Sequence, residues 1–571
     1  MQVHMKINSH IHLFTLQNVL SRETIRAMGN RLRHKKVPEF IIKGIEEFIS
    51  GLADKPVHMN EDQLLSGLVK SIISTDVFKE YIRVFPDEFR ILNRISIDGN
   101  QLSGAALRQI LDIITSVIES KGDAKWKVSS FYQLFRIATK PHTTDIADHY
   151  LQHLNPEDTL IALMMDIHGE DESERDRRRF IRQMNELKEA SLQRPGHIFP
   201  FFAVNPKRSD HFELMVDALE NQGFAGIKLY PSLGYRMSDP KLHRVFEYCS
   251  DHDIPIMTHC NDSGFYIEDN FREYCHPDEY KPVLQEFDNL KICFAHFGGC
   301  ENFFEAGYQT NNSSWTKKIV DLIDEYPNVY ADISFHTDMM EDSEKETLYF
   351  KNLTALLNDP HRKKRVLFGT DSWLLRLKIT DELYWLYFEE LLSTVHFKQI
   401  TEKNPKTFLG LEPVQQNMEL YIQFFRSNKH NVGDHPAPWL KEMSGVEFKA
   451  NRDDPLWKKD KASYQTVYGV LHPFMSSGDK RLAHHKQANI RMDQLKFWKN
   501  KYRNPKNFND ETRGIAKSII DYSGNSSISQ GLNGKLTKNE AENTILAMLQ
   551  EPEITLRDLV IQLETMHTFK F

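Results

Sequence analysis

The chain has 571 residues, 40% of them hydrophobic and 27% charged, a composition typical of globular proteins that argues against a fibrous or disordered chain. A single hydrophobic core stops growing at roughly 250 to 300 residues, so we expect more than one structural unit. The net charge of −8 is modest for this length and argues against wholesale nucleic-acid binding.

The first predicted strand lies in the N-terminal sequence QVHMKINSHIHLF. Residues two apart in a strand face the same side, so His10 and His12 can point in one direction. The segment lacks the apolar core of a signal peptide, and the sequence contains no uncharged apolar run of roughly 18 residues, the length that a membrane span requires. We therefore expect a cytoplasmic protein that does not contact membranes.

A helical insertion is predicted after this strand, over residues 15–140. Its segments VPEFIIKGIEEFISGL, EDQLLSGLVKSII and GAALRQILDIITSVIES carry apolar residues at i, i+3, i+4 and i+7. Loops that follow the strands of a barrel lie on its catalytic face, so the insertion should form a lid that shapes the active site.

Alternating strands and helices are predicted from residue 159 to residue 411. The strands are TLIALMMDIH (159–168), IFPFFAVNP (198–206), AGIKLYP (225–231), IPIMTHC (254–260), LKICFAHFGG (290–299), VYADISFH (329–336) and RVLFGTDSW (365–373). With the first strand they number eight, which predicts an α/β fold of the (β/α)₈ TIM-barrel class over residues 1–14 and 141–412. An open doubly wound sheet has the same local pattern and is the alternative.

The remaining residues, 413–571, are predicted to form a mostly helical or irregular accessory region whose role the sequence leaves open. Within it, residues 480–508 interleave basic and aromatic side chains. Such a stretch can track a nucleic-acid backbone, but it is more often a solvated helix face whose aromatic residues pack on a neighbouring domain.

All five cysteines lie between Cys249 and Cys300, an odd number without CxxC spacing. This pattern predicts free thiols in a reducing compartment.

Candidate metal ligands occur at or near the C-terminal ends of successive predicted strands. They are His10, His12, Lys228, His259, His296 and Asp371. Taken singly, each has a simpler explanation, such as a hydrogen-bonded interior histidine or a helix cap. Their order along five strands is harder to explain in that way. Imidazole and carboxylate ligands together suit Zn²⁺, with Mn²⁺ or another divalent ion as the alternative.

Candidate substrate-binding residues follow the same strands. They are Tyr230, Arg236, Asp262 and Trp373. A guanidinium at Arg236 could form a bidentate pair with a substrate carboxylate, or it could make a loop salt bridge.

The ordered motifs SHIH, GIKLYP, PIMTHCND, FAHFGG and VLFGTDS resemble those of the amidohydrolase superfamily, and ITEKNPKTFLGL is similar to the closing turn and helix of its Amidohydrolase_2 group. The resemblance implies that His10, His12, His259 and Asp371 bind a metal and that Asp371 is also the general base. It further implies that Lys228 is carboxylated and that His296 completes a second metal site. Where only one metal is bound, His296 would instead be a catalytic group.

The predicted function is hydrolysis of an amide, lactone or ester of a small molecule by a metal-activated water. A non-oxidative decarboxylase acting on a carboxylic acid at the same site is one alternative. A binding or regulatory protein that acts through its C-terminal region is another. A homo-oligomer is compatible with the sequence, and neither the substrate nor the number of metals can be read from it.

Overall fold

A computed structural model of the chain describes residues 5–34, 37–52, 61–84, 137–151, 157–168, 172–261, 264–303, 313–341, 343–375, 381–433 and 436–445, together with Leu134 and Leu154. The predicted helix at 104–120, the site candidate Asp262 and the basic aromatic stretch at 480–508 lie outside these residues.

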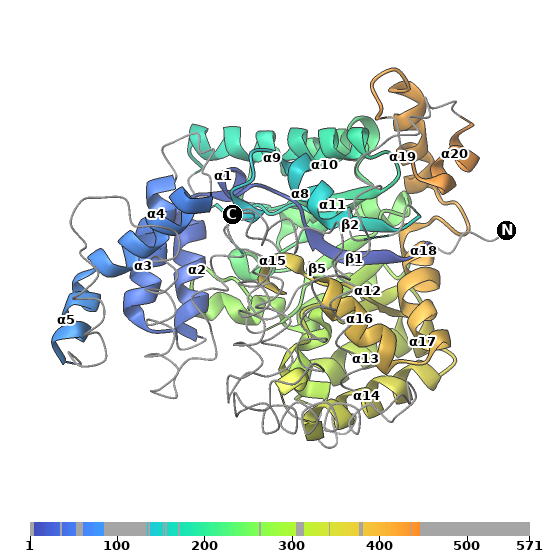
Figure 1. Ribbon diagram of the computed structural model, residues 1–571. Coiled ribbons are helices and arrows are strands. Elements are labelled where there is room, and N and C mark those ends of the chain that lie inside the picture. The colour runs from blue at the N-terminus through green and yellow to red at the C-terminus, as the bar shows by residue number, and fades with distance from the viewer. Residues whose placement is uncertain are drawn as a thin grey trace, which may run out of the picture.

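Eight parallel strands form the centre of the molecule (Figure 1). They are β1 (Ile7–His12), β2 (Thr159–Leu163), β3 (Ile198–Val204), β4 (Gly226–Leu229), β5 (Ile256–His259), β6 (Ile292–Ala295), β7 (Val329–Asp332) and β8 (Val366–Leu367). Each pairs with the next in chain order. The ring closes because the Ser9 amide donates to the Phe368 carbonyl at 2.9 Å and the Asp371 amide donates to the His10 carbonyl at 2.8 Å. The predicted TIM barrel is therefore confirmed and the open sheet is excluded.

Helices alternate with these strands. They are α8 (Thr143–Leu151), α9 (Glu174–Gln193), α10 (His211–Asn221), α11 (Pro240–Asp251), α12 (Lys281–Glu286), α13 (Trp315–Glu325), α14 (Ser343–Asn358) and α16 (Asp381–Leu391), with the short α15 (Ser372–Leu375) directly after the last strand. Side chains cap several of them: Ser173 begins α9, Asp239 begins α11 and Ser314 begins α13, each accepting a backbone N–H. Every strand residue is buried, as expected where helices cover the outside of a filled barrel.

The closing helices cover the N-terminal end of the barrel. They are α17 (Thr394–Lys398), α18 (Asn404–Leu409), α19 (Gln416–Ser427) and α20 (Pro438–Ser444). The Asn404 side chain donates to the Val366 carbonyl at 2.6 Å, which ties the closing turn to β8. The Tyr421 hydroxyl donates to the Ile198 carbonyl, and the Trp439 indole N–H donates to the Gly196 carbonyl, both at the start of β3. Both side chains belong to the same hydrophobic cluster as the barrel interior. The opposite, C-terminal end of the strands carries the loops of the site.

The insertion after β1 is helical where the structure describes it. It contains α1 (Leu16–Val19), α2 (Arg22–His34), α3 (Glu39–Leu52), α4 (Glu61–Ser74) and α5 (Asp76–Val84), the last four of which gather beside the barrel in Figure 1. A Cβ on Gly44 would lie 2.5 Å from the Ile72 Cα, so α3 and α4 pack too closely for a larger residue there. The three-part division of the chain remains a prediction.

All five cysteines are unpaired and buried. Among the described helices, none combines the length and the apolar character that crossing a membrane would require.

Candidate metal centre

The end of β1 and the turn after β8 bring three candidate ligands together. His12 Nε2 lies 3.6 Å from Asp371 Oδ1, and His10 Nε2 lies 3.9 Å from the same oxygen. Ligands bonded at roughly 2 Å to one Zn²⁺ stand a little more than 3 Å apart, so these separations suit a shared ion. The predicted convergence of the first and last strands therefore occurs.

His259 and His296 extend this cluster from β5 and β6. The centroid of the His296 ring lies 5.0 Å from that of His10 and 4.9 Å from that of His259. His259 also stacks on Tyr230, with centroids 4.0 Å apart and planes 8° apart. A Cβ on Gly264 would lie 1.9 Å from His259 Nε2, so only glycine fits where the loop after β5 passes this ring.

The orientation of the rings leaves nitrogen lone pairs for an ion. His12 Nδ1 lies 3.1 Å from the Leu163 carbonyl and His296 Nδ1 lies 3.1 Å from the Ser334 carbonyl, which place the proton of each neutral ring on Nδ1. Four buried atoms of this cluster have no hydrogen-bond partner among the described residues: His10 Nε2, His259 Nε2, Lys228 Nζ and Asp371 Oδ1. Unpartnered polar atoms are costly when buried, and a divalent cation would satisfy the imidazole and carboxylate atoms. The residues present therefore fit a metal ion.

Burial sets the protonation of the cluster. It lowers the pKa of His12, His259 and His296 well below the ordinary value, which keeps these rings neutral and able to donate a lone pair. Burial also raises the pKa of Asp371, against the opposing charges of His10, Arg31 and Lys228. An ionisable carboxylate held in such surroundings is suited to accept a proton.

Lys228 lies in β4, as predicted, with its side chain inside the barrel. Burial lowers its pKa to about 8, opposed first by the charge of Asp332 and then by that of Asp371. A lysine with a lowered pKa carries a larger fraction of neutral amine near neutral pH, and the neutral amine is the form that reacts with CO₂. The chemistry that the resemblance implies for Lys228 is therefore compatible with its environment.

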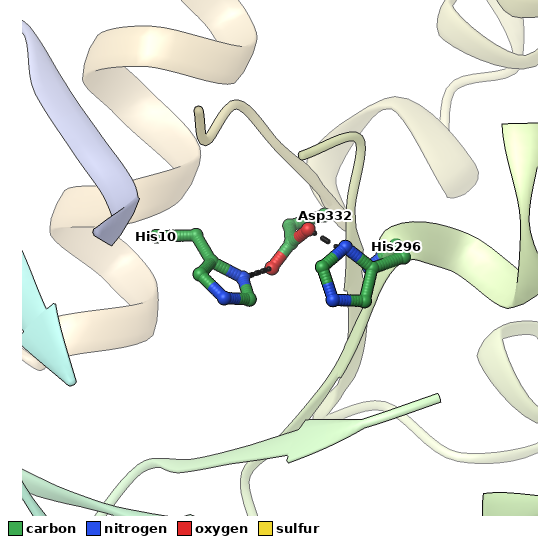
Figure 2. A group of neighbouring side chains, drawn as sticks. All are labelled: His10, His296 and Asp332. Carbon is green, nitrogen blue, oxygen red and sulfur yellow. Dashed lines mark hydrogen bonds and ion pairs between the residues drawn. The ribbon is translucent and has the colours of Figure 1, made fainter. Parts of the chain in front are cut away.

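Asp332, at the end of β7, is a residue of the site that the sequence analysis did not single out. Figure 2 shows its carboxylate between the rings of His10 and His296. One oxygen lies 2.9 Å from His10 Nδ1, and the other accepts the backbone N–H groups of His296 and Ser334, each at 2.9 Å. Burial alone would raise its pKa, but His10, His296 and Ser334 hold that pKa below its ordinary range.

His10, His296 and Asp332 form a second group close enough to hold an ion. The hydrogen bonds already made by both oxygens favour a positioning role for Asp332.

Replacing Asp332 by asparagine is expected to weaken metal binding by roughly 10- to 100-fold, because the amide no longer fixes the proton on His10 Nδ1. Competition between the protein and a chromogenic chelator for Zn²⁺ measures this affinity. Asp324→Asn, at an exposed carboxylate that pairs with Arg362, is the control. Unchanged affinity in the Asp332 variant would show that Asp332 does not position the His10 ring.

A mostly apolar pocket with about 1010 Å³ of empty space, including its open mouth, lies directly over these residues. The candidate metal ligands in its wall are His12, His259, His296 and Asp371, and the substrate candidates Tyr230 and Trp373 also line it. Trp373 packs against Phe14 at 4.6 Å between centroids. Its buried indole N–H has no acceptor among the described residues.

Arg236 lies outside this pocket. Its side chain is half exposed, forms a salt bridge with Glu279 at 2.6 Å and covers the Tyr274 ring. Of the two interpretations of Arg236, a pair with a substrate carboxylate or a loop salt bridge, the structure therefore contains the loop salt bridge. The arginine that does line the pocket is Arg31 of α2, from the inserted helices. No sequence motif marks Arg31, because its position depends on how the insertion packs on the barrel.

The amidohydrolase family model matches residues 149–411. No curated protein matches the chain. Among solved structures, 2,6-dihydroxybenzoate decarboxylase from Rhizobium is 14% identical, with a TM-score of 0.34 over 47% of this chain and 89% of that one. The 5-carboxyvanillate decarboxylase from Sphingomonas paucimobilis is 11% identical, with a TM-score of 0.33 over 53% of this chain and 95% of that one. The 4-oxalomesaconate hydratase from Rhodopseudomonas palustris is 11% identical, with a TM-score of 0.34 over 75% of this chain and 100% of that one.

The matched segment begins in α8 and ends after α18, so it covers seven of the eight strands and all of the candidate site residues except those of β1. The family match and the eight-stranded barrel support the amidohydrolase superfamily for residues 149–411.

Proposed function

We propose that this protein is a metal-dependent hydrolase that opens an amide, lactone or ester bond of a small molecule. The observation that carries the proposal is the convergence of His10, His12 and Asp371, whose candidate donor atoms all lie within 4.8 Å of one another. His12 and Asp371 also line the pocket. The family supports an enzyme with a metal centre, and Zn²⁺ suits this set of ligands best.

The chain supplies the remaining groups of such a reaction. A divalent ion bound here would lower the pKa of a water and polarise the scissile carbonyl. Asp371 would serve as the general base, taking a proton from the attacking water and returning it to the leaving group. Asp332 and the Leu163 carbonyl hold the rings of His10 and His12 in place. His296, whose ring lies 5.0 Å from that of His10, would either complete a second metal site or polarise the substrate.

A non-oxidative decarboxylase is the second candidate. The pocket wall around the site is mostly apolar and aromatic, and a poorly solvated surrounding favours the loss of a charged carboxylate as neutral CO₂. Both reactions would use the same metal and the same Asp371.

Three measurements test the proposal. We expect elemental analysis of the purified protein to show one or two equivalents of a divalent metal, and we expect a chelator to abolish turnover and Zn²⁺ or Mn²⁺ to restore it. Incubation with panels of lactones, amides and aromatic carboxylic acids separates the candidates, because hydrolysis releases acid and decarboxylation releases CO₂. Protein that holds no metal after purification and reconstitution would overturn both.

A further inference from the structure

We propose that His336 is a positioning residue that fixes His296 at the candidate metal centre by holding its backbone carbonyl. The inference rests on the proposed function and deepens it, because it explains what keeps His296 in place for either of its two roles. It also assigns a task to two helices on the outside of the barrel, α14 and α16.

His296 lies on a turn with an unusual backbone. The φ angles of His296, Phe297, Gly298 and Gly299 are 64°, 46°, 78° and 117°, all in the left-handed region. Residues other than glycine adopt such angles rarely, because the Cβ comes too close to the backbone. A turn strained in this way persists only where contacts from its surroundings hold it.

The loop after β7 makes these contacts with alternate residues. Asp332 accepts the backbone N–H of His296 at 2.9 Å, and the Ser334 carbonyl lies 3.1 Å from His296 Nδ1. His336 Nε2 lies 2.8 Å from the His296 carbonyl. A carbonyl oxygen can only accept, so Nε2 of His336 carries a hydrogen and donates it. The backbone donor, the ring and the backbone acceptor of His296 are therefore all held by one loop.

The side chain between these contacts points elsewhere. Phe335 has a φ of 57° and lines the pocket, as His296 does. His336 is 1% exposed and is not among the described residues that line this pocket. His336 therefore acts on the site through His296 and not by touching a substrate.

Two buried tyrosines hold His336 in turn. The Tyr349 hydroxyl, from α14, lies 2.8 Å from His336 Nδ1, which accepts its proton when the neutral ring carries hydrogen on Nε2. The Tyr384 hydroxyl, from α16, accepts the His336 backbone N–H at 3.0 Å and donates to the Ile333 carbonyl at 2.7 Å. Both tyrosine side chains are fully buried. These bonds leave the His336 ring one orientation, in which Nε2 faces the His296 carbonyl.

The test follows the Nδ1–H signal of His296 by NMR in full-length, Zn²⁺-loaded protein labelled with ¹⁵N at histidine. The signal is identified by its absence from His296→Gln. We expect His336→Asn to raise the solvent-exchange rate of this proton by roughly 10-fold or more, because the turn opens more often. The asparagine amide reaches the place of Nδ1 but not that of Nε2, so the donor to the His296 carbonyl is lost.

His336→Gln is the conservative rescue. Its amide nitrogen reaches the place of Nε2 and can donate to the same carbonyl, so the exchange rate should stay close to that of the unmodified protein. His211→Asn is the matched control, because His211 is also buried and its ring also contacts backbone carbonyls, those of Arg208 and Lys241. It should leave the His296 signal unchanged.

Kinetics on a substrate identified by the panels give a second readout. His336→Asn should lower kcat by roughly 10- to 100-fold with little change in KM, as is typical when a residue that orients a site histidine is lost. His336→Gln should recover most of this loss.

Tyr349→Phe removes one oxygen and decides the question if His336→Asn fails to fold. It should raise the exchange rate of the His296 proton by a smaller factor, because the His336 ring is then less firmly oriented. The proposal is overturned if folded His336→Asn, or Tyr349→Phe in its place, leaves this rate unchanged. It is also overturned if the Asn and Gln variants change the rate equally, since ring packing and not the N–H would then matter. The NMR measurement needs no turnover, so its failure is distinguishable from failure of the proposed hydrolase.

Discussion

Asp371→Asn is expected to lower kcat by roughly 10²- to 10⁴-fold, the range typical of a lost general acid or base. Asparagine keeps the shape of the side chain but cannot take a proton from the attacking water. The backbone at Asp371 has a φ of 52°, a left-handed conformation that asparagine tolerates better than most residues. The amide N–H that Asp371 donates to the His10 carbonyl is also kept, so the barrel should remain closed.

Asp253→Asn is the matched control for this experiment. Asp253 also has a positive φ, of 57°, but it precedes β5, at the end of the barrel opposite the site. Steady-state kinetics on a substrate identified by the panels should show normal turnover in the Asp253 variant. Nearly normal kcat in the Asp371 variant, with its metal content unchanged, would remove Asp371 from the proton-transfer role.

Arg208→Met is expected to lower the free energy of unfolding by about 3–5 kcal/mol, because it leaves the buried Asp166 carboxylate without its guanidinium partner. Glu172, which Arg208 also binds, loses the same partner. The Arg208 side chain is 1% exposed and that of Asp166 is 5% exposed. Two guanidinium nitrogens of Arg208 contact the two carboxylate oxygens of Asp166 at 2.9 and 3.1 Å. The guanidinium carbon also lies 3.9 Å from the centroid of the Phe180 ring. The pair joins the loops after β2 and β3, so the loss should be global and visible in chemical denaturation.

Two further variants make this prediction specific. Arg362→Met removes a similar bidentate partner, from Asp324, but at the surface, and should cost less than about 1 kcal/mol. The double variant Arg208→Met with Asp166→Leu should regain much of the lost stability, because a well-packed apolar pair often replaces a buried ion pair at little cost. Equal losses in the Arg208 and Arg362 variants would show that burial does not control the strength of the pair.

The local pattern of the sequence predicted the barrel, and ring closure in the structure excluded the open sheet. Short apolar strands and helices of regular spacing are local properties, and eight such units with parallel strands have few ways to bury their faces. The same pattern predicted which side chains would meet: residues at the carboxyl ends of parallel strands share one end of a closed barrel. His12 and Asp371, far apart in the chain, accordingly lie within 3.6 Å of each other.

Tertiary structure alone decided the environment of the remaining site residues. Asp332 follows an ordinary strand, and its role beside His10 arises only because β7 and β1 converge on the same end of the barrel. The sequence pattern favoured Arg236, which follows a predicted strand, yet Arg236 pairs with Glu279 at the surface and Arg31 of the insertion is buried in the pocket wall. The sequence thus determined the barrel and the convergence of its histidines and aspartate, because strand period and order are encoded locally. The packing of the inserted helices determined which arginine lines the pocket, because that depends on contacts between segments that no short pattern specifies.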